Sequence, residues 1–171
     1  MPIFEYTNNQ IMKSILFSFL FLLTINLNAQ KTVFSKEYGI SLTVPNDVYK
    51  YETEAVTVLG YESEDENLSV DIEVFNISEQ LESFIKSQKN GAVNTAKGLG
   101  LKKVTYGGIV PNIKNAHYAI AHDYYDGEDN LVYVIAAINP KKQLAYEITI
   151  YMYDNNTSVG KDILNSFRLI N

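Results

Sequence analysis

The segment from Ala116 to Asp154 constrains the fold more than any other part of the chain. It contains three apolar runs separated by polar segments at 126–130 and 139–142, which carry the Asp, Asn, Gly and Pro residues typical of turns. The middle run, 131–138, is apolar throughout, whereas a half-exposed strand alternates apolar and polar residues. We therefore expect three consecutive strands, with the middle one inside a sheet that is covered on both faces.

Further strands are predicted before and after one long helical segment. Alternating apolar residues predict strands at 33–38, 40–44, 55–61, 68–75 and 102–110. Between the last two, apolar residues recur with helical spacing over 79–97, and Ser78 is the expected N-cap. Phe84 and Ile85 are expected to anchor this helix to the sheet.

A second, shorter helix is predicted over 157–167, with Ile163 and Phe167 as its anchors. Helices and strands are thus segregated along the chain rather than strictly alternating. The predicted fold class is therefore α+β, with a mostly antiparallel β-sheet flanked by helices.

The first 29 residues are predicted to be a secretory signal peptide. An apolar core at 15–25 follows Lys13 and precedes a small-residue site at Ala29, and it is shorter than the roughly 20 residues that a spanning helix needs. Met12 is the expected translation start. The alternative interpretation of the apolar core is a membrane anchor. Cleavage after Ala29 leaves 30–171, a length that fits a single domain. The chain has no cysteine, and export without disulfides favours a bacterial periplasm or exterior.

Three segments, at 38–45, 81–85 and 163–168, carry a family resemblance. They read Tyr-Gly-Ile-Ser-Leu-Thr-Val-Pro, Leu-Glu-Ser-Phe-Ile and Ile-Leu-Asn-Ser-Phe-Arg. In this order they resemble the PsbP-like superfamily, which includes the oxygen-evolving subunit of photosystem II, a eukaryotic Ran-binding protein and many secreted bacterial proteins. The resemblance implies a PsbP-like α/β/α sandwich and a non-enzymatic binding or assembly role.

Only two side chains, His117 and His122, ordinarily titrate near neutral pH. Five positions apart in a predicted strand, they point to opposite faces, so each is expected to face solvent or a neighbouring polar group. The sequence contains no nucleophile elbow, zinc-protease motif or phosphate-binding loop. We therefore expect no catalytic residues, no cofactor and no enzymatic activity.

One predicted hairpin end gathers residues that could bind calcium through oxygen ligands. They are His122, Asp123, Asp126, Glu128 and Asp129. The spacing of a calcium-binding loop is missing, and turns are rich in Asp and Gly for backbone reasons. A solvated turn is therefore expected rather than a metal site, and calcium binding is the alternative.

The charge balance argues against nucleic acid as a partner. The chain has 20 acidic and 14 basic side chains, a net charge of −6 and a single arginine, Arg168. Binding to phosphates needs clustered positive charge, and the lysines occur here as short pairs. The expected partner is therefore not a nucleic acid.

Tyrosines and acidic turns mark the expected partner surface. Among 13 tyrosines, Tyr151 and Tyr153 share a strand face with Glu147, opposite the apolar face expected to join the core. Tyrosine favours strands but is also enriched at protein interfaces. Two acidic segments at hairpin ends, 62–66 and 126–129, are expected to be solvated turns first and a charged partner face second. The candidate partner residues in them are Glu64, Asp65, Glu66, Asp126, Glu128 and Asp129.

These features predict an exported, non-enzymatic binding or assembly module that recognises a protein partner in the periplasm or outside the cell. It is expected to be a monomer or weak oligomer with no membrane span after signal cleavage. A binder of a small ligand or envelope component, using a tyrosine-lined groove, is the alternative, and a hydrolase is third. A deep pocket with convergent polar groups would favour a ligand or an enzyme, whereas a flat tyrosine and acid surface would favour a protein.

Overall fold

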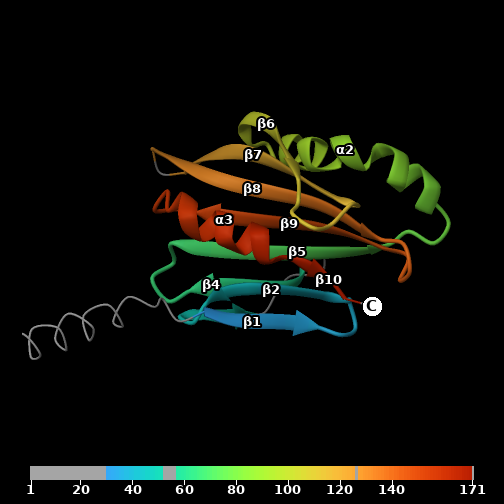
Figure 1. Cartoon of the computed structure of the whole chain (residues 1–171). Helices are drawn as coiled ribbons and strands as arrows, with labels where there is room; N and C mark the ends of the chain where they lie inside the picture. Colours follow the sequence, from blue (N-terminus) through green and yellow to red (C-terminus); the bar gives the residue numbers. More distant parts are fainter. Residues whose placement is uncertain (1–29, 52–56, 126, 171) are drawn as a thin grey trace, which may run out of the picture.

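The computed structural model describes residues 30–51, 57–125 and 127–170 (Figure 1). The predicted signal peptide, the expected start at Met12, and Asp126 lie outside these described residues. Within the described ranges, no helix is long and apolar enough to cross a membrane.

Seven strands form one large antiparallel sheet in the order β3-β4-β5-β9-β8-β7-β6. In chain order they are β3 (Val48–Tyr51), β4 (Thr57–Ser63), β5 (Leu68–Asn76), β6 (Lys102–Ile109), β7 (Ala116–Tyr125), β8 (Glu128–Asn139) and β9 (Leu144–Met152). The three consecutive strands expected after Ala116 are confirmed as β7, β8 and β9. β8 is paired on both edges, and the stretch 132–135 is buried on both faces, so the interior position is also confirmed.

A smaller sheet and a helix pack together against one face of the large sheet (Figure 1). The small sheet has the order β1-β2-β10, with β1 (Gln30–Ser35), β2 (Ile40–Pro45) and β10 (Arg168–Leu169). Helix α3 (Thr157–Ser166) contacts β2, β8 and β9. Ile40 and Leu42 of β2, Ile163 of α3 and Ile148 of β9 belong to one buried cluster. This cluster is the main core of the domain.

Helix α2 (Leu81–Gly98) covers only part of the other face of the large sheet. It packs on β6, β7 and β8 and reaches β9 only at its margin. Its fully buried residues, Ala92 and Ala96, are small, so the helix axis can lie close to Ala119 and Val134 of the sheet. The fold is thus an α+β sandwich in which one outer layer is α2 and the other combines α3 with the small sheet.

The structure corrects the predicted start of the long helix. The N-cap is Gln80 rather than Ser78, and no side chain caps the helix, because Ser78 instead donates its amide to Asn76 Oδ1 in the preceding turn. Ile85 was expected to anchor the helix but is 37% exposed. The prediction fails for Ile85 because the buried residues of α2 lie in its second half. Phe84, the other expected anchor, is half-buried.

Strand β3 has no counterpart in the sequence prediction. The sequence correctly ends β2 at Pro45, but the chain turns within two residues and Val48 is already buried and paired with Ser63. The positions 62–63, expected to belong to a solvated turn, therefore extend β4. This short strand adds two tyrosines, Tyr49 and Tyr51, to the face that α2 leaves uncovered.

Candidate functional site

The part of the large sheet that α2 leaves uncovered carries tyrosine and acid side chains. Residues paired directly across neighbouring strands point to the same side of a sheet, so the register of β3, β4, β5 and β9 identifies them. We call this surface the open face. Its side chains are Tyr49, Tyr51, Glu62, Asp71, Glu73, Glu147, Tyr151 and Tyr153, with Asp123 and Tyr125 of β7 and Glu128 of β8 at its border.

Two tyrosines of β3 donate hydrogen bonds to acids on neighbouring strands. The Tyr49 hydroxyl donates to Glu62 Oε2 over 3.0 Å. The Tyr51 hydroxyl reaches across β4 and donates to Asp71 on β5. This reach requires Gly60, because a Cβ at that position would lie 2.4 Å from Cζ of the Tyr51 ring. A glycine in β4 thus lets an aromatic side chain lie flat on the open face.

A second group of tyrosines forms a continuous aromatic surface beside these acids. The rings of Tyr151 and Tyr153 are stacked, with centroids 5.9 Å apart and an interplanar angle of 5°. Tyr125 meets Tyr153 edge-on at 6.4 Å. Burial raises the pKa of Tyr151 to about 12, and Tyr153 and Asp123 add to the rise. The hydroxyl of Tyr151 therefore stays neutral at physiological pH.

The carboxylates of the open face have no cationic partner in the described ranges, where the ion pairs are those of Asp129 with Lys103 and His122. Glu73 and Glu147 are direct cross-strand partners, an arrangement in which like charges destabilise a sheet. Burial raises the pKa of Glu73, and the charges of Glu147 and Asp71 raise it further. The open face thus concentrates negative charge at a cost to stability.

This arrangement predicts that Glu73→Gln stabilises the protein at neutral pH. A carboxyl group whose pKa is raised by folding destabilises the folded state when ionised, and the effect vanishes once the group is protonated in both states. We expect the variant to gain about 0.5 kcal/mol at pH 7. The gain should shrink as the pH falls toward and below 4.5, the ordinary pKa of a glutamate. Urea unfolding of both proteins at several pH values measures this difference, and a gain that persists at acidic pH would contradict it.

Comparisons with known proteins place the fold. No protein-family model matches the sequence, and no curated protein matches it. The structure resembles the Ran-binding protein Mog1p of Saccharomyces cerevisiae with a TM-score of 0.58 and 11% identity, over 84% of this chain and 96% of Mog1p. It resembles cyanobacterial PsbP from Synechocystis sp. PCC 6803 with a TM-score of 0.50 and 10% identity, over 85% of this chain and 95% of that one. The chain has the PsbP/Mog1-like fold.

Two further solved structures share this PsbP/Mog1-like fold. LpqN of Mycobacterium tuberculosis, described as involved in cell envelope biogenesis, gives a TM-score of 0.50 at 11% identity, over 84% of this chain and 91% of LpqN. A protein of Bacteroides thetaiotaomicron gives 0.56 at 12% identity, and the match covers 82% of this chain but 48% of that one. The resemblance predicted from three short segments is therefore confirmed at the level of the fold.

Within the PsbP/Mog1-like fold, the predicted acidic residues do not all lie on one surface with Tyr151 and Tyr153. Glu128 is the strand partner of Tyr125 and falls on the same side of the sheet as the open face, whereas the other described acids lie elsewhere. Asp129 pairs with Tyr124 and lies two positions before Leu131, which packs against the main core. Side chains two positions apart share a strand face, so Asp129 lies on the α3 side of the sheet. There it accepts hydrogen bonds from Lys103 and His122, both at 2.6 Å, and Lys103 above all lowers its pKa.

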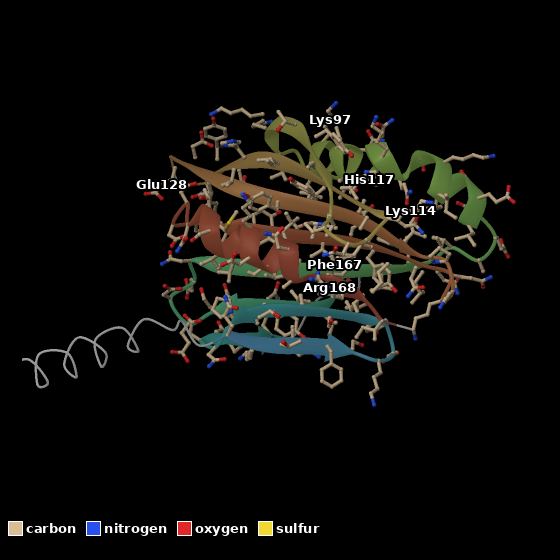
Figure 2. All side chains as sticks on the ribbon, in the orientation of Figure 1. Lys97, Lys114, His117, Glu128, Phe167 and Arg168 are labelled. Atoms are coloured by element: carbon tan, nitrogen blue, oxygen red, sulfur yellow. The ribbon has the colours of Figure 1, made fainter. Side chains whose placement is uncertain are left out.

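The remaining predicted acids lie at strand ends. Glu64, Asp65 and Glu66 form the exposed β4–β5 turn, and Asp65 accepts hydrogen bonds from Ser63 Oγ at 2.6 Å and from the Asn67 amide at 3.2 Å. These bonds lower the pKa of Asp65 and give its carboxylate a role in the turn itself. Glu128 is exposed at the start of β8, at the opposite end of the sheet from Lys114 (Figure 2).

The two histidines lie on opposite faces of β7, as predicted. His117 is buried on the α2 side, where its Nδ1 is 2.8 Å from the Tyr106 hydroxyl, and burial lowers its pKa. His122 lies on the other side with Asp129. Strand alternation also separates His122 from Asp123, and in the described ranges no three His, Asp or Glu side chains are placed to hold a metal ion.

Two hollows in the surface differ from the predicted tyrosine-lined groove. A cavity of about 410 Å³ between α3, β2 and the β4–β5 turn has four aspartates and several amides around an apolar floor, and no tyrosine lines it. A second, of about 170 Å³, is lined in part by Tyr118 and Tyr133 but is smaller than the roughly 300 Å³ at which ligand pockets begin. The tyrosines of the open face instead lie on the surface of a sheet.

Sequence reasoning identified Tyr151 and Tyr153 but not the residues around them. The alternation of β5 predicts that Asp71 and Glu73 face water, as they do, without indicating that they would meet Glu147. The sequence does not predict β3, and it therefore does not place Tyr49 and Tyr51 on this face. The available signal was strand alternation, which places Ser69, Asp71 and Glu73 on one side of β5 and Glu147, Thr149 and Tyr151 on one side of β9.

Proposed function

We propose that the chain is an exported, non-enzymatic binding module whose open face recognises a protein partner. The observation that supports this function is a half-buried sheet face, left uncovered by α2, that combines stacked tyrosines with carboxylates lacking a cationic partner among the described residues. Tyrosine provides apolar area and a polar tip and is enriched in protein interfaces. A small ligand would instead favour a concave pocket that encloses most of its surface.

The functions of structural relatives support the same class of role. Mog1p is a Ran-binding protein, and LpqN is described as involved in cell envelope biogenesis. At 11% identity, these relatives supply an analogy of fold, so the role proposed here rests on the residues of the open face. No catalytic constellation enters this proposal.

Site-specific photo-cross-linking tests the protein-binding function. A benzophenone amino acid replaces Glu62 on the open face. When the native host produces this variant and exports it to the cell envelope, we expect a discrete adduct with one protein. The same probe at Phe34, which is 62% exposed on β1, serves as the control. The adduct partner, purified and mixed with the protein, should bind at least about tenfold more weakly to Tyr151→Ala/Tyr153→Ala, since truncated aromatic anchors commonly cost more than 1 kcal/mol. Equal adducts from both positions, or unchanged affinity, would contradict the function.

Export is tested by the mass of the mature protein. We expect cleavage after Ala29, so the protein recovered from the envelope or medium should begin at Gln30, in free or cyclised form. The control is a chain whose apolar core is interrupted by two charged residues at 19 and 20, which should remain uncleaved in the cell. Recovery of an exported chain that still begins at Met12 contradicts the predicted signal peptide.

A further inference from the structure

Hydrogen-bond acceptors outnumber donors on the open face. Ionised Asp and Glu side chains are acceptors only, and the face and its border carry six of them: Glu62, Asp71, Glu73, Asp123, Glu128 and Glu147. Tyr49 and Tyr51 each donate to one acid, Glu62 and Asp71. Glu73, Asp123 and Glu147 have no side-chain donor among the hydrogen bonds of the described residues.

The pair formed by Glu73 and Glu147 is the most unusual of these groups. The two carboxylates lie directly opposite each other on β5 and β9, and Asp71 lies two positions along the same strand face. Such like-charge pairs destabilise a sheet, and neutral residues would fit the same positions. Two facing carboxylates are well suited to hold a cation between them.

Two buried acceptors without partners lie near the ends of the same surface. Asn130 is 2% exposed, its Oδ1 has no hydrogen-bond partner, and it pairs with Asp123 beside the tyrosine stack. Gln88 Oε1 of α2 is likewise buried without a partner. Gln88 lies along α2 between Phe84 and Gly91. Phe84 packs near Ile138, and Gly91 lies over Ala136, which is the strand partner of Glu147. Asn130 and Gln88 therefore each leave one buried amide oxygen without a hydrogen-bond donor.

We propose that the open face binds an arginine-bearing segment of the partner protein. This inference rests on the protein-binding function proposed above and specifies the chemistry of its partner. A guanidinium group has five N–H donors and no acceptor, and it can bind a carboxylate through two parallel hydrogen bonds. One arginine binds between Glu73 and Glu147, and a second stacks on the Tyr151 and Tyr153 rings next to Asp123.

Arginine fits this surface better than lysine for two reasons. The planar guanidinium stacks on aromatic rings, whereas the ammonium group of lysine is a compact, strongly hydrated point charge. From Glu147 to Tyr153 the strand rises about 20 Å, so an extended segment would place two arginines about six positions apart on one side. The single arginine of this chain, Arg168, donates to the carbonyls of Asn165 and Phe167 and lies in β10 of the small sheet.

Peptide binding to the purified protein tests the inference. The probe is a fluorescent peptide with two arginines about six positions apart in an otherwise Gly-Ser sequence. Matched peptides carry lysine, or citrulline, which has nearly the shape of arginine without its charge. Fluorescence anisotropy at low and moderate salt is expected to show binding of the arginine peptide, and binding at least about tenfold weaker for the other two.

Two variants with the same change in net charge locate the site. Glu73→Gln/Glu147→Gln should weaken binding of the arginine peptide at least about tenfold. Glu37→Gln/Asp162→Asn, at exposed positions in the β1–β2 turn and on α3, should change it less than about twofold because distant exposed charges are screened. Since Glu73→Gln is expected to stabilise the fold, loss of binding in the first variant would not reflect unfolding.

The outcomes separate this inference from the function on which it rests. Equal binding of the citrulline or lysine peptide, or equal losses in both variants, overturns the arginine site. If the peptides fail while the adduct at Glu62 still depends on Tyr151 and Tyr153, the partner has a different chemistry and the protein-binding function stands. If the arginine peptide binds as expected but no protein adduct forms, the open face binds guanidinium groups and the protein-binding function is wrong.

Discussion

Phe167→Ala is expected to lower the free energy of unfolding by about 3–5 kcal/mol. Phe167 directly follows α3 and is 1% exposed, and it belongs to the cluster that joins α3, the small sheet and the large sheet (Figure 2). Truncation removes a large apolar side chain and leaves a cavity at the meeting point of three elements, which cannot all move to fill it. Urea unfolding followed by tyrosine fluorescence, in a chain without tryptophan, measures the loss.

Phe34→Ala is the matched control for this prediction. Phe34 lies on β1 and is 62% exposed, so the same truncation should change the free energy of unfolding by less than about 0.5 kcal/mol. Equal losses in the two variants would mean that the layer containing α3 does not depend on Phe167 as the structure indicates.

Gly60→Val is expected to destabilise the protein by about 1–3 kcal/mol. The new side chain would begin 2.4 Å from the Tyr51 ring and displace it from β4. The Tyr51 hydroxyl would then lose Asp71, whose pKa is already raised by burial and is held down in part by this hydrogen bond. Unfolding midpoints in urea measure the loss, and weaker binding of the arginine peptide should accompany it.

A double-mutant cycle with Tyr51→Ala identifies the cause. If the clash with the ring explains the loss, Gly60→Val should cost much less in the Tyr51→Ala background, because the space above β4 is then free. Gly98→Ala serves as the control, since a Cβ there meets nothing within 4 Å. Additive losses in the cycle would show that position 60 demands glycine for another reason.

The sequence predicts those elements whose pattern is carried by their own residues. Apolar and polar residues alternate over 68–74 in β5 and over 146–150 in β9, and the continuous apolar run of β8 indicates a strand buried on both faces. The sequence therefore predicts all three strands. β3 has four residues and little pattern, and it becomes a strand because Val48 is buried and β4 offers it an edge to pair with. Long-range pairing of this kind leaves no local signal.

The open face shows the same division between local and long-range information. Because side chains alternate along a strand, Tyr151 and Tyr153 lie on one side of β9, and Asp71 and Glu73 lie on one side of β5. That these two sides coincide follows from the register of β5 with β9, whose residues are separated by a helix and three strands. The close packing of Ala92 and Ala96, which confines α2 to the other half of the sheet, is likewise a tertiary property.

The position of β9 determines when the sheet can form. β9 pairs with β5 on one edge and β8 on the other, so the strands up to residue 76 and those from 102 to 139 remain two separate groups until residues 144–152 are available. β2 similarly gains β10 only from positions 168–169. Closure therefore depends on contacts between distant parts of the chain, which form slowly because large loops must close first. A chain interrupted before β9 would present the unpaired edges of β5 and β8, two exposed strands capable of pairing with other molecules.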